Sequence, residues 1–131
     1  MFLFHQVDDG RVPGIEYLPC SAITPKVGML LKVTSGNLAA ATSTDVPLYM
    51  SMGEYEAALE AGTEIPVIRL HPDAIMEVAT PTSFSQVMGA KVTIGSDSLS
   101  ITNTTGGACE VVYTDADITR VRIVQPDAVA G

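Results

Sequence analysis

Apolar and polar residues alternate with a period of two through much of this chain, which is the pattern of half-buried β-strands. Near the C-terminus, for example, Val121 and Ile123 fall on one face of the predicted strand, and Arg120 and Arg122 fall on the other. Val, Ile and Thr are frequent, and their branched side chains favour a pleated surface. The alternation predicts strands at 14–22, 27–34, 38–42, 48–52, 64–70, 74–79, 90–94, 98–103, 108–114 and 119–125.

Turn-forming residues separate these segments. Ser35-Gly36-Asn37 predicts a three-residue hairpin loop, because Gly or Asn accepts a positive φ. Pro19 removes a ladder donor, so segment 14–22 is expected at a sheet edge or a strand end. Segment 80–89 is predicted to be a loop. Further turns are expected at Thr44-Asp45-Val46-Pro47, His71-Pro72-Asp73, Gly95-Ser96-Asp97, 104–107 and Asp115-Ala116-Asp117.

One segment predicts a helix rather than a strand. Residues Glu54 to Ala61 are good helix formers, and Gly62 suits the position after a helix C-terminus. The side chains of Glu54, Glu56 and Glu60 would form the solvated face of this helix. About two turns are too short to be stable alone, so this segment must pack against the strands or stay irregular. The predicted fold class is all-β: a small β-barrel or sandwich of about nine to ten short, mostly antiparallel strands with one short helix.

The chain has 131 residues, the size of a single domain spanning 1–131. We expect a short N-terminal arm at about 1–9 and a C-terminal tail at about 126–131. The arm is apolar and is followed by the turn-forming run Asp8-Asp9-Gly10, so it can be a strand of its own fold. It can also add a strand to a neighbour's sheet edge. In that second case the candidate partner or assembly contacts are Met1, Phe2, Leu3 and Phe4.

Charge limits the partners that this chain is expected to bind. The net charge is −8, and the 7 Lys and Arg residues are scattered, so no basic patch is available for nucleic acid or an anionic membrane. Aromatic residues make up 5%, which disfavours a stacking platform for bases or sugars. No signal peptide is recognised at the N-terminus, and no apolar run approaches the roughly 20 residues that span a bilayer.

Residues with catalytic potential are few. His71 stands two positions before Asp73 at an expected hairpin tip, where turn chemistry accounts for the Pro and the Asp without catalysis. Cys20 and Cys109 are far apart in sequence, so whether they pair is open, and a reducing compartment is the default expectation. An enzyme resting on His71 or Cys109 remains the least favoured alternative, because no nucleophile motif accompanies either residue.

The chain offers no ligand spacing typical of a metal or cofactor site. The two His and two Cys residues form no zinc motif, and no Gly-rich phosphate loop precedes a helix. Asp115-Ala116-Asp117 and Asp8-Asp9-Gly10 carry oxygen ligands, but nothing continues a calcium-binding loop, so we expect ordinary turns. We therefore expect no metal and no cofactor.

The central stretch resembles the head decoration, or capsid-stabilising (cement), proteins of tailed bacteriophages. The pattern runs P-x-V-G-M-L-L-K-V-T-S-G-N-L-A-A-A from Pro25, continues with G-T-E-I-P-V-I-R-L from Gly62, and ends with G-A-K-V-T-I-G from Gly89. The resemblance covers about residues 25–94. It implies a non-enzymatic β-fold protein that binds the major capsid protein on the capsid exterior, after assembly in the host cytoplasm, as a homo-oligomer with a trimer favoured.

A second function stays open beside this one. A β-barrel or sandwich of this size can hold a small molecule or a glycan in its polar loops, here 80–86 and 103–107. The resemblance and the scarcity of aromatic residues make the virion role the preferred expectation.

Overall fold

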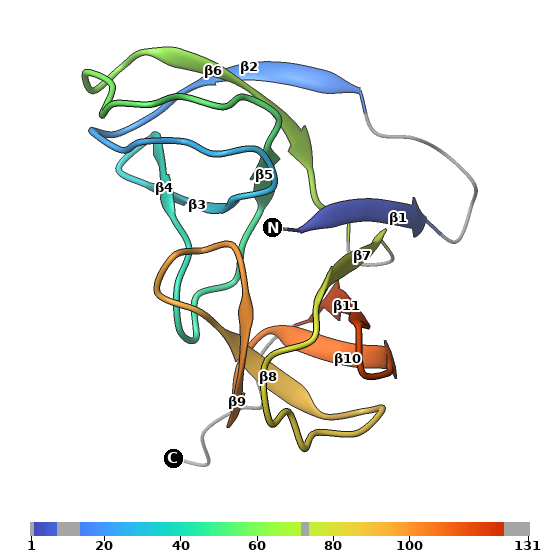
Figure 1. Ribbon diagram of the computed structural model, residues 1–131. Coiled ribbons are helices and arrows are strands. Elements are labelled where there is room, and N and C mark those ends of the chain that lie inside the picture. The colour runs from blue at the N-terminus through green and yellow to red at the C-terminus, as the bar shows by residue number, and fades with distance from the viewer. Residues whose placement is uncertain (1, 8–13, 72–73, 125–131) are drawn as a thin grey trace, which may run out of the picture.

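Two antiparallel β-sheets, one above the other in Figure 1, make up the fold of the protein in this computed structural model. The structure describes residues 2–7, 14–71 and 74–124. Within them lie eleven strands: β1 (Leu3–Val7), β2 (Ile15–Pro19), β3 (Leu30–Thr34), β4 (Asn37–Ala40), β5 (Tyr49–Ser51), β6 (Glu64–Arg69), β7 (Ala74–Ala79), β8 (Lys91–Ile94), β9 (Ile101–Thr105), β10 (Cys109–Thr114) and β11 (Ile118–Ile123).

The larger sheet has the strand order β1-β7-β11-β10-β8-β9, and the smaller one has the order β2-β6-β5-β3-β4. The expected alternation fixes which face each strand buries. In β11, for example, Thr119, Val121 and Ile123 are buried and the residues between them are not. The prediction of an all-β fold with mostly antiparallel strands is confirmed.

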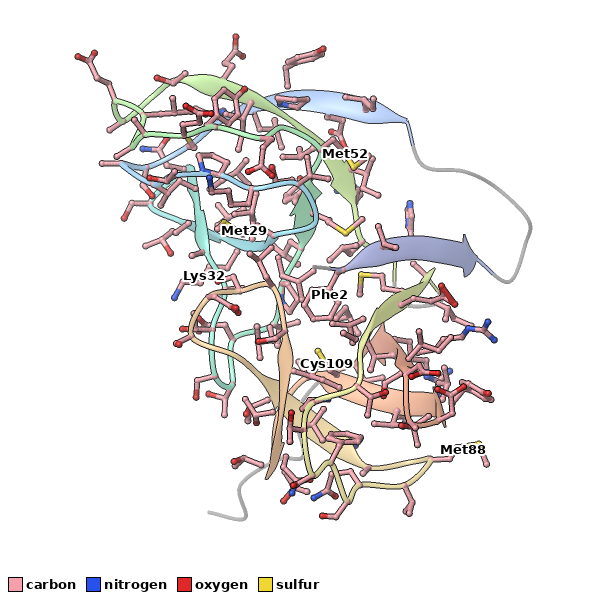
Figure 2. All side chains as sticks on the ribbon, viewed as in Figure 1. Phe2, Met29, Lys32, Met52, Met88 and Cys109 are labelled. Atoms are coloured by element: carbon pink, nitrogen blue, oxygen red, sulfur yellow. The ribbon has the colours of Figure 1, made fainter. Side chains whose placement is uncertain are left out.

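Two apolar clusters form the interior. The first lies between the sheets and joins Leu30, Met50 and Ile68 of the smaller sheet to Met76, Val121 and other residues of the larger one. Phe2 is fully buried at the centre of this cluster, where Figure 2 shows it between the two sheets. The second cluster packs on the opposite face of the smaller sheet and includes Cys20, Leu31, Leu38, Ile65 and Val67. The smaller sheet is therefore covered on both faces.

The sandwich alternative describes this arrangement better than the barrel. Neither sheet is closed by a continuous ladder of hydrogen bonds. In the smaller sheet the ends of β2 and β4 meet at a single parallel bridge between Cys20 and Leu38, where Ser21 N donates to Leu38 O at 2.8 Å. This bridge curves the sheet around the second cluster without making it a barrel.

The predicted helix at Glu54 to Ala61 is wrong: the described part of the chain contains no helix. The segment is irregular because its backbone N–H groups bond to another segment. Tyr55 N donates to Pro25 O at 2.9 Å, and Leu59 N donates to Ile23 O at 2.8 Å. Tyr55 and Leu59 also pack against the second cluster. These tertiary contacts replace the bonds of a helix too short to form alone.

The first hairpin turn also differs from its prediction. Ser35 and Gly36 have φ values of 51° and 83°, and Thr34 pairs directly with Asn37. Two positive φ values in sequence define a two-residue type I′ turn, which matches the twist of the flanking strands better than a three-residue loop. The predicted edge position of segment 14–22 is confirmed by β2, and segment 80–89 contains no strand, as expected.

Candidate functional site

The four N-terminal candidate residues have different surroundings. Phe2 is fully buried, and its N–H donates to Gly28 O at 3.2 Å, so its ring belongs to the interior of this chain. Leu3 is 47% exposed and pairs with Glu77 of β7. Phe4 pairs with Met76 through the backbone, and Met1 lies outside the described residues. Of the two side chains among these that the structure describes, Phe2 lies in the interior and Leu3 lies at the surface.

A small apolar hollow lies beside Leu3. It has a volume of about 240 Å³ and is lined by Leu3, Glu77, Val78, Ala79, Asp117 and Ile118. It forms because β1 is the edge strand of the larger sheet, and β7 runs on past the first residue of β1. An edge strand with unpaired backbone groups next to an apolar hollow can accept an extended peptide.

Five of the cations in the described part of the chain are paired with carboxylates across neighbouring strands and turns. Arg120 Nε donates to Glu77 at 2.8 Å, and its guanidinium lies 5.1 Å from the centre of the Tyr113 ring. Pairing of this kind leaves these cations little free charge to bind phosphate groups. The other four pairs are Lys26–Glu54 at 3.3 Å, Lys32–Asp45 at 3.0 Å, Arg69–Glu16 at 3.4 Å and Arg122–Glu110 at 2.7 Å.

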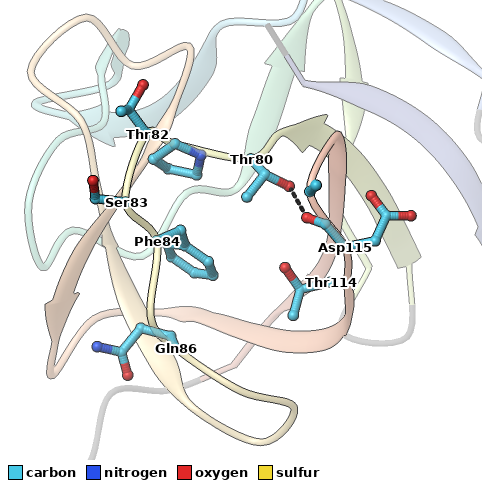
Figure 3. Close-up of a pocket in the computed structure, with 9 residues that line it drawn as sticks. Thr80, Thr82, Ser83, Phe84, Gln86, Thr114 and Asp115 are labelled. Atoms are coloured by element: carbon cyan, nitrogen blue, oxygen red, sulfur yellow. Dashed lines mark hydrogen bonds between the residues drawn. The ribbon is translucent and has the colours of Figure 1, made fainter.

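A larger, polar pocket lies at the same end of the larger sheet as the apolar hollow, between the loop that follows β7 and the turn that follows β10 (Figure 3). Its volume is about 480 Å³, and the ring of Phe84 faces into it. Asn103 supports this loop from behind, because its Oδ1 accepts hydrogen bonds from Ser85 N at 3.0 Å and Ser85 Oγ at 3.2 Å. The pocket is lined by Thr80, Pro81, Thr82, Ser83, Phe84, Gln86, Thr114, Asp115 and Ala116.

Several polar groups of this pocket are already engaged. Thr80 Oγ1 donates to Asp115 O at 2.8 Å and lies 2.8 Å from Thr119 Oγ1. The Asp115 carboxylate accepts hydrogen bonds from the backbone N–H groups of Ile118 and Asp117 and from the Tyr113 hydroxyl, each at 2.8 Å. These bonds, with that of Ile118 the largest cause, lower the pKa of Asp115.

The exposed side chains of Thr82 and Ser83 remain available on the loop side of this pocket. Ser83 has a φ of 59°, a left-handed conformation that holds the loop in a tight bend. The predicted glycan-binding loops are thus brought together, although 103–107 supports the pocket through Asn103 and segment 114–116 provides the opposite wall. The sequence does not reveal that wall, because the long-range pairing of β11 with β7 brings the turn at 114–116 beside the loop at 80–86.

In the described structure, neither Cys20 nor Cys109 has the exposure that a catalytic nucleophile needs. Cys20 and Cys109 are both free and fully buried in different clusters, so they do not pair. Burial raises the pKa of the Cys109 thiol to about 12, and burial also raises the pKa of Cys20. His71 is exposed, and Asp73 lies outside the described residues. A thiol with such a pKa stays protonated at neutral pH and is a poor nucleophile.

The acidic turn at Asp115-Ala116-Asp117 is accounted for by its own backbone bonds, whereas Asp8-Asp9-Gly10 falls outside the described residues. Among the residues that the structure describes, no three His, Cys, Asp or Glu side chains gather as metal ligands would. In the same residues, no helix has the length and apolar character needed to cross a bilayer. Comparison with protein families, curated proteins and solved structures finds no match to this chain.

Proposed function

We propose that this chain is a non-enzymatic virion protein that decorates and stabilises the capsid lattice of a tailed bacteriophage. The observation that supports the proposal most directly is the structure of the stretch that resembles decoration proteins. Its first part, 25–41, folds as one unit: a turn at Gly28 with a φ of 82°, then β3, the type I′ turn and β4. Gly28 and Gly36 of the resemblance therefore both stand in turns that need a positive φ.

The proposed mechanism uses the open sheet edge at β1. An extended segment of the major capsid protein would pair with the free edge beside Leu3 and place an apolar side chain in the hollow formed with Ala79 and Ile118. Each contact of this size is weak. Repetition over a lattice of capsid subunits, and the homo-oligomer that the resemblance implies, raise the overall affinity through effective concentration.

The first test is quantitative mass spectrometry of purified particles from the source of this sequence. A copy number comparable with that of the major capsid protein supports the proposal, a few copies indicate a vertex or tail position, and absence from particles contradicts it. A second test adds the purified chain to capsids that lack it. Leu3→Asp should reduce capsid binding, whereas Val87→Asp, at a more exposed apolar residue (69%) in the loop between β7 and β8, should not.

A second candidate function rests on the pocket at Thr80–Gln86. Hydroxyl groups and one aromatic ring, with no free charge, suit a neutral hydroxylated ligand such as a short glycan. Saturation-transfer NMR against a panel of neutral saccharides tests this function. Signals that weaken in Thr82→Val but persist in Thr104→Val, another exposed threonine outside the pocket lining, would support it. No signal at millimolar ligand would contradict it.

A further inference from the structure

The smaller sheet carries exposed apolar side chains on the face that it turns toward the larger sheet. Tyr17 of β2 is 64% exposed, and its direct partner on β6, Pro66, is half-buried. Met52, which follows β5, is 39% exposed, and its N–H donates to Pro66 O at 2.9 Å. Ile15 lies two residues before Tyr17 on the same face of β2 and is 58% exposed. These four residues, from three neighbouring strands or their ends, form the apolar patch.

The apolar patch continues the interior of the protein beyond the area that the larger sheet covers. Ile15 lies opposite Ile68, and Ile68 lies opposite Met50. Ile68 and Met50 are both buried in the first cluster. Figure 2 shows Phe2 between the two sheets and Met52 farther up, beside β6. Apolar side chains of neighbouring strands that stay exposed together in this way are typical of a surface that contacts another molecule.

Exposed carboxylates border the apolar patch. Glu64 lies two residues before Pro66 on the same face of β6, and it forms no ion pair with a described residue. Glu54, two residues after Met52, is paired with Lys26 at 3.3 Å. The segment that joins Met52 to β6 contains no Lys or Arg, and its charged residues are the exposed Glu54, Glu56, Glu60 and Glu64. The border of the patch is therefore negatively charged and favours a basic partner.

The ion pair between β2 and β6 does not offset this charge on the patch side. Glu16 stands between Ile15 and Tyr17 along β2, so its side chain points to the opposite face of the sheet. Its partner Arg69, 3.4 Å away, lies over the ring of Tyr49 at 5.3 Å from the ring centre. This cation therefore belongs to the face that bears the second cluster.

The position of the patch favours a helical partner. The bridge between Cys20 and Leu38 places β4 beside the end of β2, which leaves little of that edge for strand addition. A partner on the patch therefore contacts side chains, where an extended segment would leave its backbone groups unpaired. An α-helix pairs these groups internally. The patch crosses three strands, a span of roughly 10 Å at about 4.8 Å per strand, and helix positions i, i+4 and i+7 cover about the same distance.

We propose that the apolar patch binds a basic amphipathic helix of another protein. Apolar side chains of that helix lie across Tyr17, Pro66 and Met52, and its Lys or Arg side chains face Glu64 and the acidic segment before it. A second copy of this chain is a poor occupant. It carries a net charge of −8, five of its described cations are already paired with carboxylates, and its described part contains no helix.

The contact is small, so the complex is weak. Four side chains cover well below the roughly 1,200 Å² of a standard stable interface. We therefore expect a dissociation constant of about 0.1–1 mM at about 20 mM salt. Binding should weaken at least threefold at about 300 mM salt, because the ions screen the attraction between lysine and glutamate side chains.

A ¹H–¹⁵N NMR titration of the purified chain tests the proposal and does not depend on any role in a virion. The probe is a synthetic peptide of leucine and lysine, about 14 residues long, with its leucines at helical spacing. We expect the largest shifts at the backbone amides of Ile15, Tyr17, Met52 and Glu64. A peptide with glutamate in place of lysine, and a scrambled peptide of the same composition, should both bind at least tenfold more weakly.

Variants separate the apolar from the charged contribution. Tyr17→Ser should weaken binding at least fivefold, whereas Val87→Ser, an equally exposed apolar residue on the larger sheet's loop, should leave it unchanged. Glu64→Lys should also weaken binding at least fivefold. Asp117→Lys, the same change of charge at an exposed residue between β10 and β11, should not. The spectrum of each variant shows whether it is folded.

Three results would overturn the proposal. The first is the absence of shifts with about 1 mM peptide at low salt, where the expected affinity gives substantial occupancy. The second is a set of shifts centred on Val87 and Met88, which would place the peptide on another exposed apolar surface. The third is equal binding of the scrambled peptide, which would indicate attraction by net charge alone.

Discussion

Truncation of Phe2 is the perturbation that best separates an N-terminal strand of the fold from a free assembly arm. The ring is fully buried between the sheets, among residues that include Leu30, Met50 and Met76. Phe2→Ala removes its transfer free energy and leaves a cavity, which together cost about 3–5 kcal/mol. Because domains of this kind have free energies of unfolding of about 5–15 kcal/mol, the variant should lose a large fraction of its stability.

The expected cost converts to a measurable change in melting temperature. With an unfolding entropy of about 2.1 cal/mol/K per residue, a chain of this length loses about 10–18 °C for the same 3–5 kcal/mol. Leu3→Ala is the matched control one residue away. Its side chain is half exposed, so its removal should cost about 1 kcal/mol or less. Phe2→Leu should recover most of the stability, because it restores most of the apolar volume.

Urea unfolding followed by circular dichroism provides the free energies, with the slope of the transition showing whether the three variants unfold as the parent does. A Phe2→Ala variant within about 1 kcal/mol of the parent would refute the reasoning, because a fully buried ring cannot be removed so easily. That result would mean that Phe2 does not occupy the interior in solution. The free-arm interpretation, with Phe2 as a partner contact, would then regain its place.

Three further predictions concern single groups. Ser98 has a φ of 60° and a buried hydroxyl without a partner among the described residues, so Ser98→Gly should raise the free energy of unfolding in urea by about 0.5–2 kcal/mol, more than Ser98→Ala. The lowered pKa of Asp115 means that its ionised form stabilises the fold above the ordinary carboxyl value near 3.8, and that this contribution is lost as pH falls through the folded-state pKa. The stability difference between the parent and Asp115→Asn should therefore shrink below about pH 4, and a constant difference would contradict this. Cys20 and Cys109 should react with a thiol reagent at pH 8 only after unfolding, and rapid labelling of the native chain would disprove their burial.

Local sequence signals predict the strands well where they agree with long-range contacts. Alternation places β7 at the predicted residues 74–79, and Pro19 marks β2 correctly as an edge. The start of β3 is predicted too early. Gly28 takes a left-handed turn, and Met29 N bonds back to Lys26 O at 3.1 Å, so the strand begins at Leu30. A glycine inside an apolar run is ambiguous by sequence alone.

The helix prediction fails for a different reason. The composition of segment 54–61 favours a helix by a few tenths of a kcal/mol per residue, which is a weak preference. The carbonyl groups of Ile23 and Pro25, which outcompete the helical acceptors, lie some thirty residues earlier in the chain. No local pattern reveals them. The same limit applies to the pocket, whose two walls at 80–86 and 114–116 meet only through the pairing of β11 with β7 and β10.

Alternation also cannot show which apolar face of a strand will be covered. Val121 and Ile123 in β11 and Ile15 and Tyr17 in β2 have the same spacing, yet the first pair is buried and the second is more than half exposed. The difference is their place in the sheets. Strand β11 lies between β7 and β10 and faces the other sheet, whereas β2 is an edge strand beyond the reach of the shared core. Residue spacing alone therefore does not distinguish a strand in the interior of a sheet from a strand at its edge, because both carry the same alternation of apolar side chains.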